Sequence, residues 1–257
     1  MKNRRLWAFA LVCLLLVPCI GLSQKRAVQE RDTDRFTFTF GVKTLFMTDT
    51  ELQFEDFDVY FDGLLAGPML SVQIANTESF WDNFEFNVST YFGDLDAYDS
   101  SGLGLSADYI GCSLDITDVK VDVCYRIIPY LGAFIDYRYR KYRLSRGLGE
   151  WPQTGSSMLE DEMYAGGLGL KGALPLGETG LFAYGSGEWI PYAEYLNSDS
   201  SAWGATLKAG LGYAIEGGEW LPVALTMTTG YRYHIIDSDG YFDERTDSGT
   251  ADIVVSW

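Results

Sequence analysis

The residue types that most often carry catalysis are sparse in this sequence. His234 is the single histidine among 257 residues. A histidine that acts as a general base needs a positioned partner, and Asp-x-His and His-x-Ser are two short patterns that supply one. The residues two positions away are Arg232 and Ile236, so neither pattern is present. We interpret His234 as a hydrogen-bonding group, and we predict no catalytic residue and no cofactor.

Carboxylates gather in two segments whose chemistry suits cations. TDTELQFEDFDVYFDG (48–63) and DSDGYFDERTD (237–247) are both strongly acidic, and the first contains no basic residue. Carboxylate oxygens are the ligands that Ca²⁺ and Mg²⁺ prefer, so divalent cations are candidate partners if both segments are outside loops. The simpler interpretation is a solvated acidic surface, because DSDG alone falls far short of a complete calcium loop. We therefore predict no defined metal site.

The elements that would position these groups are β-strands. Apolar and polar residues alternate with a period of two along most of the chain, and no segment has a convincing helical period. In VKVDVCYRI, for example, Val119, Val121 and Val123 share one face, whereas Lys120 and Asp122 share the other. The sequence predicts an all-β protein.

The alternating segments indicate a transmembrane barrel rather than a soluble β-sandwich. They run to about ten residues or more, the length of a tilted strand that crosses a bilayer, whereas sandwich strands need only about five or six. Short turns at 127–130, 175–180 and 216–220 alternate with mostly longer polar segments at 143–161, 196–202 and 237–249. Tyrosines and tryptophans near segment ends suit aromatic girdles at the two membrane interfaces; they are Tyr125, Tyr130, Tyr137, Tyr139, Trp189, Tyr192, Trp203, Trp220, Tyr231 and Tyr233. We predict an antiparallel up-and-down transmembrane β-barrel.

Ten strands are the preferred count, and the fourth is the ambiguous one. The predicted strands are 35–48, 67–76, 83–94, 108–127, 131–143, 161–174, 180–194, 202–215, 221–236 and 248–257. In the fourth, the apolar parity changes from Ile116 to Val119, which predicts a β-bulge near Thr117 or a turn at Thr117 and Asp118. The turn, with LQFEDFDVYF as a further strand, would give twelve strands; losing an early pair would give eight.

The polar faces of these strands predict a lumen filled with charge. The predicted network comprises Lys43, Glu85, Lys120, Asp122, Arg126, Asp136, Arg138, Arg140, Lys171, Glu188, Lys208, Arg232, His234 and Asp252. So many mixed charges in a narrow tube should pair with one another. Across the hairpin at 128–130, we predict an ion pair between Asp122 and Arg138.

The N-terminus predicts export. Residues 1–23 combine a basic start, an apolar run from about Leu6 to Leu22 and small residues before Gln24, which is the pattern of a signal peptide. Residues 24–257 would then form the barrel domain. Removing the leader takes away three positive charges and no negative ones, so the net charge goes from −17 to −20 and nucleic acid is not expected as a partner. Cys112 and Cys124 would be the remaining cysteines, too few for a disulfide scaffold.

The pattern resembles the small outer-membrane β-barrels of Gram-negative bacteria, broadly the OmpA and Opacity-type barrels. The final strand of that class commonly ends on an aromatic residue with apolar residues at alternate positions before it, as Ile253, Val255 and Trp257 do here. The resemblance implies that these residues form an assembly signal read by the barrel assembly machinery. It also implies passage through periplasmic chaperones, residence in the bacterial outer membrane, and contact with the lipid bilayer and lipopolysaccharide.

The resulting functional hypothesis is a barrel with a structural or surface-interaction role and no enzymatic activity. A narrow channel for small solutes or ions is the alternative. An outer-membrane hydrolase is the third, since such enzymes use a histidine with a partner that His234 lacks.

Overall fold

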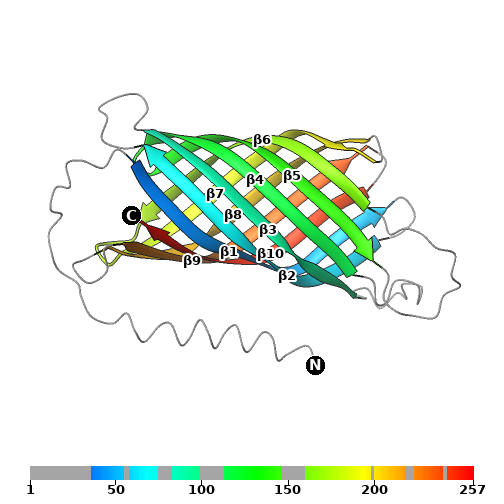
Figure 1. Ribbon diagram of the computed structural model, residues 1–257, viewed down its shortest axis with the longest axis horizontal. Coiled ribbons are helices and arrows are strands. Elements are labelled where there is room, and N and C mark those ends of the chain that lie inside the picture. Colours follow the sequence, from blue (N-terminus) through cyan, green and yellow to red (C-terminus); the bar gives the residue numbers. More distant parts are fainter. Residues whose placement is uncertain are drawn as a thin grey trace, which may run out of the picture. The chain divides into compact units, whose positions relative to one another are not determined.

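The protein is a closed antiparallel β-barrel of ten strands in up-and-down order (Figure 1). A computed structural model describes residues 36–54, 58–74, 83–98, 113–145, 160–197, 200–217, 223–239 and 242–257. The strands are β1 (Phe36–Phe54), β2 (Asp58–Ile74), β3 (Phe84–Tyr98), β4 (Ser113–Ile128), β5 (Leu131–Ser145), β6 (Glu160–Pro175), β7 (Leu181–Tyr195), β8 (Ser200–Ile215), β9 (Ala224–Ser238) and β10 (Phe242–Ser256). The predicted fold class and the preferred strand count are confirmed. Within the described ranges, no helix is long and apolar enough to cross a membrane.

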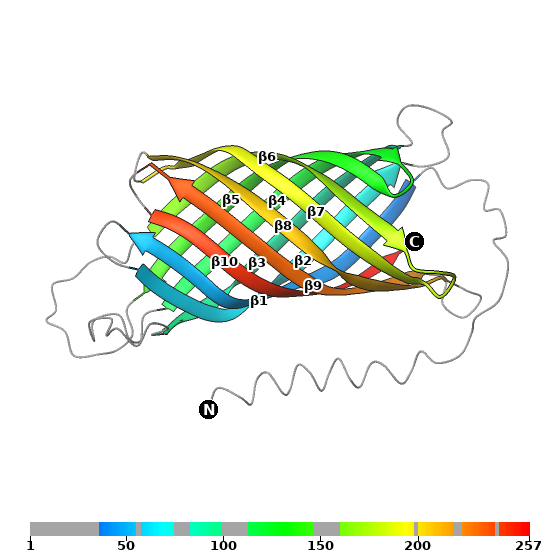
Figure 2. The ribbon, with the colours of Figure 1, turned by 180° about the vertical axis from the view of Figure 1, so that it is seen from behind.

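The barrel closes where β10 pairs with β1. The strands are steeply tilted, and the view from behind shows β6 to β10 completing the wall (Figure 2). Closure leaves no open sheet edge, so backbone groups are satisfied between strands. The backbone N–H and C=O of Trp257 both bond to Phe38 at 3.0 Å, and the two rings stack at a centroid distance of 6.4 Å. We call this end of the barrel, where β1 begins and β10 ends, the terminal end, and the opposite end the distal end.

An apolar belt surrounds the terminal part of the outer surface. On β2 the outward side chains from Leu64 to Ile74 are all apolar, whereas Asp58, Tyr60 and Asp62 follow toward the distal end. The remaining strands change in the same way, with belt segments of about nine to eleven residues, the length that spans a bilayer at a tilt. The most exposed belt residues include Phe40, Phe92, Val121, Ile135, Leu170, Trp189, Leu207, Leu211 and Tyr231.

Above the belt, the outer face is polar, and we call this zone the distal collar. Its side chains include Asp49, Glu51, Asp62, Asp94, Asp96, Asp115, Thr117, Lys141, Arg143, Glu160, Glu162, Glu194, Asp237 and Asp247. Several predicted girdle aromatics lie near the border between the two zones, and Tyr164 packs against Tyr137 and Tyr139 there. Trp220, another predicted girdle residue, lies outside the described residues. The strands therefore extend beyond the length that lipid would cover.

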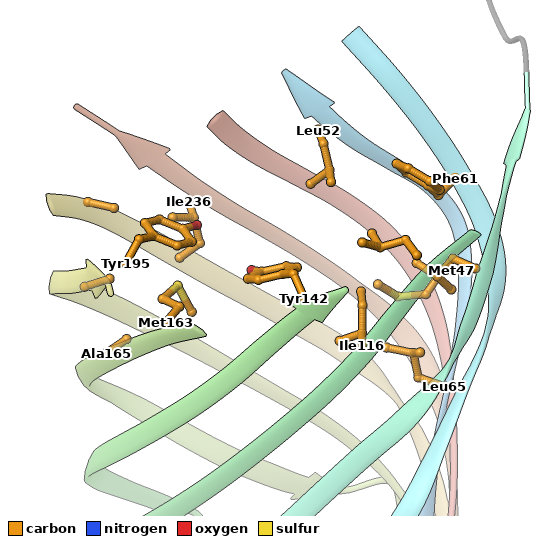
Figure 3. Packing of buried hydrophobic residues seen from close by; sticks show 14 of the residues in the cluster. Met47, Leu52, Phe61, Leu65, Ile116, Tyr142, Met163, Ala165, Tyr195 and Ile236 are labelled. Atoms are coloured by element: carbon orange, nitrogen blue, oxygen red, sulfur yellow. The ribbon is translucent and has the colours of Figure 1, made fainter. Parts of the chain in front are cut away.

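Inside the collar, the lumen is filled mainly by apolar side chains, with a few buried polar residues such as Thr50 and Asp161 among them. Figure 3 shows residues from opposite walls, among them Leu52, Phe61, Ile116, Tyr142 and Ile236, converging within the barrel. We call this cluster the distal core; its remaining members are Leu45, Met47, Val59, Leu65, Leu95, Leu114, Met163, Ala165, Ile190, Ala193, Tyr195 and Ala202. The polarity of the wall thus inverts along the barrel: apolar outward in the belt, apolar inward in the collar.

The inversion corrects the predicted bulge in the fourth strand. β4 runs from Ser113 to Ile128 as one strand, and its register with β3 is unbroken, so there is neither a bulge nor a turn near Thr117. Ile116 points into the distal core and Val119 points outward into the belt, each on its own parity. The apolar face changes side because the surroundings change. Register shifts occur elsewhere: in β1 between Met47 and Thr50, in β7 between Ile190 and Ala193, and at the other end of β4 between Arg126 and Ile128.

The connections correct the predicted loops. Residues 99–112 separate β3 from β4 in the sequence, and residues 146–159 separate β5 from β6. The acidic segment 48–63 and the predicted loop 237–249 are mostly strand where they are described, so only 55–57 and 239–241 lie between strands there. In LQFEDFDVYF (52–61), residues 52–54 therefore end β1 and residues 58–61 begin β2, so this segment is not a separate further strand. At the terminal end, the β6–β7 turn has Gly177 and Gly180 at φ of 82° and 80°, which residues with a side chain rarely adopt. The predicted leader, 1–23, lies outside the described residues.

Candidate functional site

A cavity of about 520 Å³ occupies the lumen between the terminal end and the distal core. At the terminal end its wall includes Pro129 and Tyr130 of the β4–β5 turn, and at its inner end it includes Arg232 and Leu45. Leu45 belongs to the distal core, so the apolar cluster forms the inner boundary of the cavity. The lining combines apolar residues such as Met69, Phe134 and Phe182 with many charged ones. The size falls in the range of small-molecule sites, about 300–1,000 Å³.

The first charge cluster crosses the middle of the lumen from β4 and β5 to β7. Lys120 Nζ lies 2.6 Å from Glu188 Oε2 and 3.0 Å from Asp136 Oδ2. Arg138 Nη2 lies 3.2 Å from Glu188 Oε1, so one carboxylate accepts from both cations. Lys120 and Arg138 are direct cross-strand partners, and like charges so placed repel. Glu188 offsets that repulsion from the opposite wall.

The second cluster lies beneath the distal core and is almost fully buried. Arg140 donates to Asp118 at 2.5 Å and to Glu244 at 2.6 Å, joining β4, β5 and β10. Glu244 also accepts from the hydroxyls of Tyr142 and Thr246. Buried charges are tolerated when they are paired and hydrogen-bonded, and Glu244 has four such bonds. This cluster connects strands far apart in the sequence across the lumen.

His234 is buried beside the second cluster and does not line the cavity. Its Nδ1 lies 2.9 Å from the Thr206 hydroxyl, and its Nε2 lies 4.0 Å from Glu244, beyond hydrogen-bond distance. A general base must reach a bound substrate. The surroundings of His234 suit a structural group better than a catalytic one.

Two smaller groups lie toward the terminal end. Lys171 lies 3.2 Å from Glu85 and 3.5 Å from Asp122, and Asn87 also donates to Asp122 at 2.9 Å. On the other side of the lumen, Lys208 pairs with Asp252 at 3.0 Å and lies 5.3 Å from the centre of the Tyr184 ring. These cations are more exposed than Arg138 or Arg140.

All of the predicted network residues lie in the lumen. Ten line the cavity: Lys43, Glu85, Lys120, Asp122, Arg126, Arg138, Lys171, Glu188, Lys208 and Arg232. Asp136, Arg140, His234 and Asp252 contact the network described above. The predicted Asp122–Arg138 ion pair is wrong: Asp122 bonds to Lys171 and Asn87, whereas Arg138 turns to Glu188. The hairpin register places Asp122 opposite Asp136, so each cation finds a carboxylate on another strand.

Sequence reasoning missed two central carboxylates, Asp118 and Glu244. Asp118 fell at the supposed bulge, and Glu244 fell in a supposed loop. The usable signal was their strand parity, since Asp118 is in phase with Lys120 and Asp122. Cys124, on the same face, is buried with a free thiol, and Cys112 lies outside the described residues.

The acidic segments place their described carboxylates mainly on the collar. Three pairs of aspartates face each other across neighbouring strands: Asp62 with Asp96, Asp94 with Asp115, and Asp49 with Asp247. Partial burial, together with Asp94, raises the pKa of Asp115. Tyr60 donates to Glu51 at 2.9 Å, and this bond raises the pKa of Tyr60 to about 12. Among the described residues, no group of three or more His, Cys, Asp or Glu is arranged to hold a metal ion.

Comparison with known proteins identifies the fold. No protein-family model matches the sequence, and no curated protein matches it significantly. The outer membrane protease OmpT from Escherichia coli is similar in structure, with 9% identity, a TM-score of 0.50, and coverage of 89% of this chain and 98% of that one. The β-domain of the Bordetella autotransporter BrkA has 10% identity, a TM-score of 0.48, and coverage of 86% and 98%. At such identities the likeness to OmpT extends to the outer-membrane barrel fold alone.

Proposed function

We propose that the protein is an outer-membrane β-barrel with a closed lumen that acts as a structural or surface-interaction protein, not as a channel or an enzyme. The observation that carries this proposal is the distal core. A conducting pore needs a continuous aqueous path, and tightly packed apolar side chains exclude water. The cross-lumen pairs of Arg140 and Lys120 support the same conclusion, because they hold opposite walls together.

The proposed orientation places the terminal end in the periplasm and the distal end outside the cell. The apolar belt would contact the bilayer, and the collar with its connections would stand above it. The collar is predominantly acidic, so contact with lipopolysaccharide phosphates would go through bridging divalent cations. Ile253 and Val255, in the belt, and Trp257, at its terminal edge, would form the signal for the barrel assembly machinery after delivery by periplasmic chaperones.

The absence of enzymatic activity remains part of the proposal. Its support is the position of His234, which is buried, bonded to Thr206 and separated from the cavity. Turnover of lipid or peptide that is lost in His234→Ala, with the barrel still folded, would favour the hydrolase alternative instead.

Planar-bilayer conductance tests the proposal. Purified, heat-modifiable protein should add no stable current to the bilayer. The comparison uses the protein concentration at which a porin control gives clear stepwise increases in current. The matched variant replaces Phe61, Ile116 and Tyr142 with glycine, which empties part of the distal core; it should conduct if it folds. Stable unitary currents through the unaltered protein would replace this proposal with the narrow-channel alternative.

A further inference from the structure

We infer that the lumen cavity is a binding site for a small organic anion with an apolar body, entered from the terminal end. The inference concerns binding in the part of the lumen that the distal core leaves open, so it goes beyond the proposed non-conducting role.

The first observation is an unpartnered cation at the inner end of the cavity. Arg232 lines the cavity and is 7% exposed, yet no carboxylate of the described residues lies within the 4.0 Å of an ion pair. Its backbone carbonyl accepts from Ser248, but the described residues form no hydrogen bond to its guanidinium. A buried charge without a partner is costly, so a cation in this position favours an anion beside it.

The second observation is the cross-strand neighbour of Arg232. Lys208 is directly opposite Arg232 in the β8–β9 register, which places two cations side by side on the lumen face. Only Lys208 has a carboxylate, that of Asp252. The Lys120–Arg138 pair in β4–β5 shows how the fold relieves such repulsion, because both cations share Glu188. At Arg232 no carboxylate of the described residues comes within 4.0 Å, and Asp118, which acts on it from farther away, already binds Arg140.

The carboxylates that line the cavity already bind other cations of the protein. Glu85 and Asp122 bind Lys171, Asp118 binds Arg140, and Glu188 binds Lys120 and Arg138. Lys43 and Arg126 also line the cavity without a carboxylate within 4.0 Å among the described residues. An entering anion would therefore meet unpaired cations from the mouth, near Arg126, to the inner end at Arg232.

The lining also defines the rest of the ligand. Met69, Phe134, Phe182 and Tyr184 supply an apolar and aromatic wall in the same cavity. A volume of about 520 Å³ admits a body larger than a bare inorganic anion. The chemistry shared by fitting ligands is a carboxylate, sulfonate or phosphate carried on an apolar body.

The test measures binding of 2-naphthalenesulfonate by isothermal titration to the full barrel in nanodiscs of zwitterionic lipid, with empty nanodiscs as the blank. The unaltered protein should bind this anion, and added salt should weaken the binding. Neutral 2-naphthol should bind at least tenfold more weakly. Arg232→Gln should weaken sulfonate binding by about tenfold or more, since a hydrogen-bonded charge contact contributes that much.

The matched control is Arg245→Gln, the same change at an exposed position of β10 on the outer face, which should leave affinity unaltered. If Arg232→Gln does not give a heat-modifiable barrel, Ser186→Trp, which places an indole at a cavity-lining position, should abolish binding. No binding to the unaltered protein, equal binding to Arg232→Gln, or equal binding of 2-naphthol would each overturn the inference. None of these results involves conductance, so the closed-lumen proposal is judged separately.

Discussion

On β4, Val121 and Ile116 are five residues apart and lie on opposite faces of the same wall. Val121 points outward and is 42% exposed, whereas Ile116 points inward and is 2% exposed. Each apolar side chain faces the medium that accepts it, which is lipid beside the belt and the distal core inside the collar. The terminal half is thus built as a membrane barrel, and the distal half as a soluble barrel with its own core.

The contrast between the belt and the collar explains where the charges lie. In the belt, the outer face already satisfies the apolar requirement, so the lumen can hold Lys171, Lys208 and their carboxylates around a cavity. In the collar, water surrounds the wall and the lumen must supply the hydrophobic burial. The second cluster, around Arg140, lies at the boundary between belt and collar. Neither water nor lipid reaches it there, so its charges must be stabilised by pairing with one another.

The largest expected effect comes from breaking the second cluster, around Arg140. Glu244→Gln removes the charge that Arg140 and Tyr142 contact, leaving a buried cation under-compensated. We expect a loss of about 3–5 kcal/mol in the free energy of unfolding, measured by denaturant titration in lipid vesicles. The control is Glu160→Gln on the collar, which removes an exposed pair with Lys141 and should leave stability unchanged. Equal effects at both sites would show that the boundary is wet.

A charge on the outer face should distinguish belt from collar. Val121→Arg would place a cation against lipid near the middle of the belt and should cost about 2–4 kcal/mol. Thr117→Arg is the matched change, on the same face of the same strand four residues toward the distal end, and it should cost far less. Similar losses in the two variants, measured by the same titration, would mean that lipid covers the collar as well.

A conservative change inside the collar tests whether the distal core is packed. Ile116→Val removes one methylene from the cluster and should cost about 0.5–1.5 kcal/mol, because the neighbours cannot close the gap fully. The reference is Val121→Ala on the belt, where lipid can fill the space. There the loss of unfolding free energy, divided by the apolar surface area removed, should be smaller than for Ile116→Val. A neutral Ile116→Val would indicate a loosely filled lumen.

The smallest effect concerns repulsion on the collar. Asp115 faces Asp94, and its pKa is raised in the folded protein. A raised folded-state pKa means that the protonated acid is favoured on folding, so its contribution is present at low pH and is lost as pH rises through that pKa. Asp115→Asn should therefore stabilise the protein at pH 7 by about 0.2–1 kcal/mol, and the gain should vanish below about pH 4.

Glu194→Gln is the control for this change, since Glu194 faces Tyr164 and Ser201 rather than a carboxylate and should show no gain. A gain for Asp115→Asn that persists at low pH would rule out charge repulsion as its cause.

The sequence predicts the architecture well because alternation persists wherever lipid faces the wall. The β4 residues Val119, Val121 and Val123 and the inward position of Lys120 follow from this rule alone. The rule fails in the collar, where Ile116 and Leu52 are apolar but face the lumen. In the sequence, such residues look like evidence for a bulge or for another strand. The rule also cannot predict which charges pair, since Arg138 and Glu188 meet across the lumen from strands that are not neighbours.

Quenching of a fluorescent label along β4 tests the inversion most directly. In a background with Cys112 and Cys124 replaced by serine, single cysteines at Val121, Thr117 and Ile116 would be labelled and reconstituted in vesicles. A lipid-soluble quencher should reach the label at 121 but not at 117, a water-soluble quencher should do the reverse, and neither should reach position 116 efficiently. Equal lipid quenching at 121 and 117, or ready aqueous quenching at 116, would contradict the account.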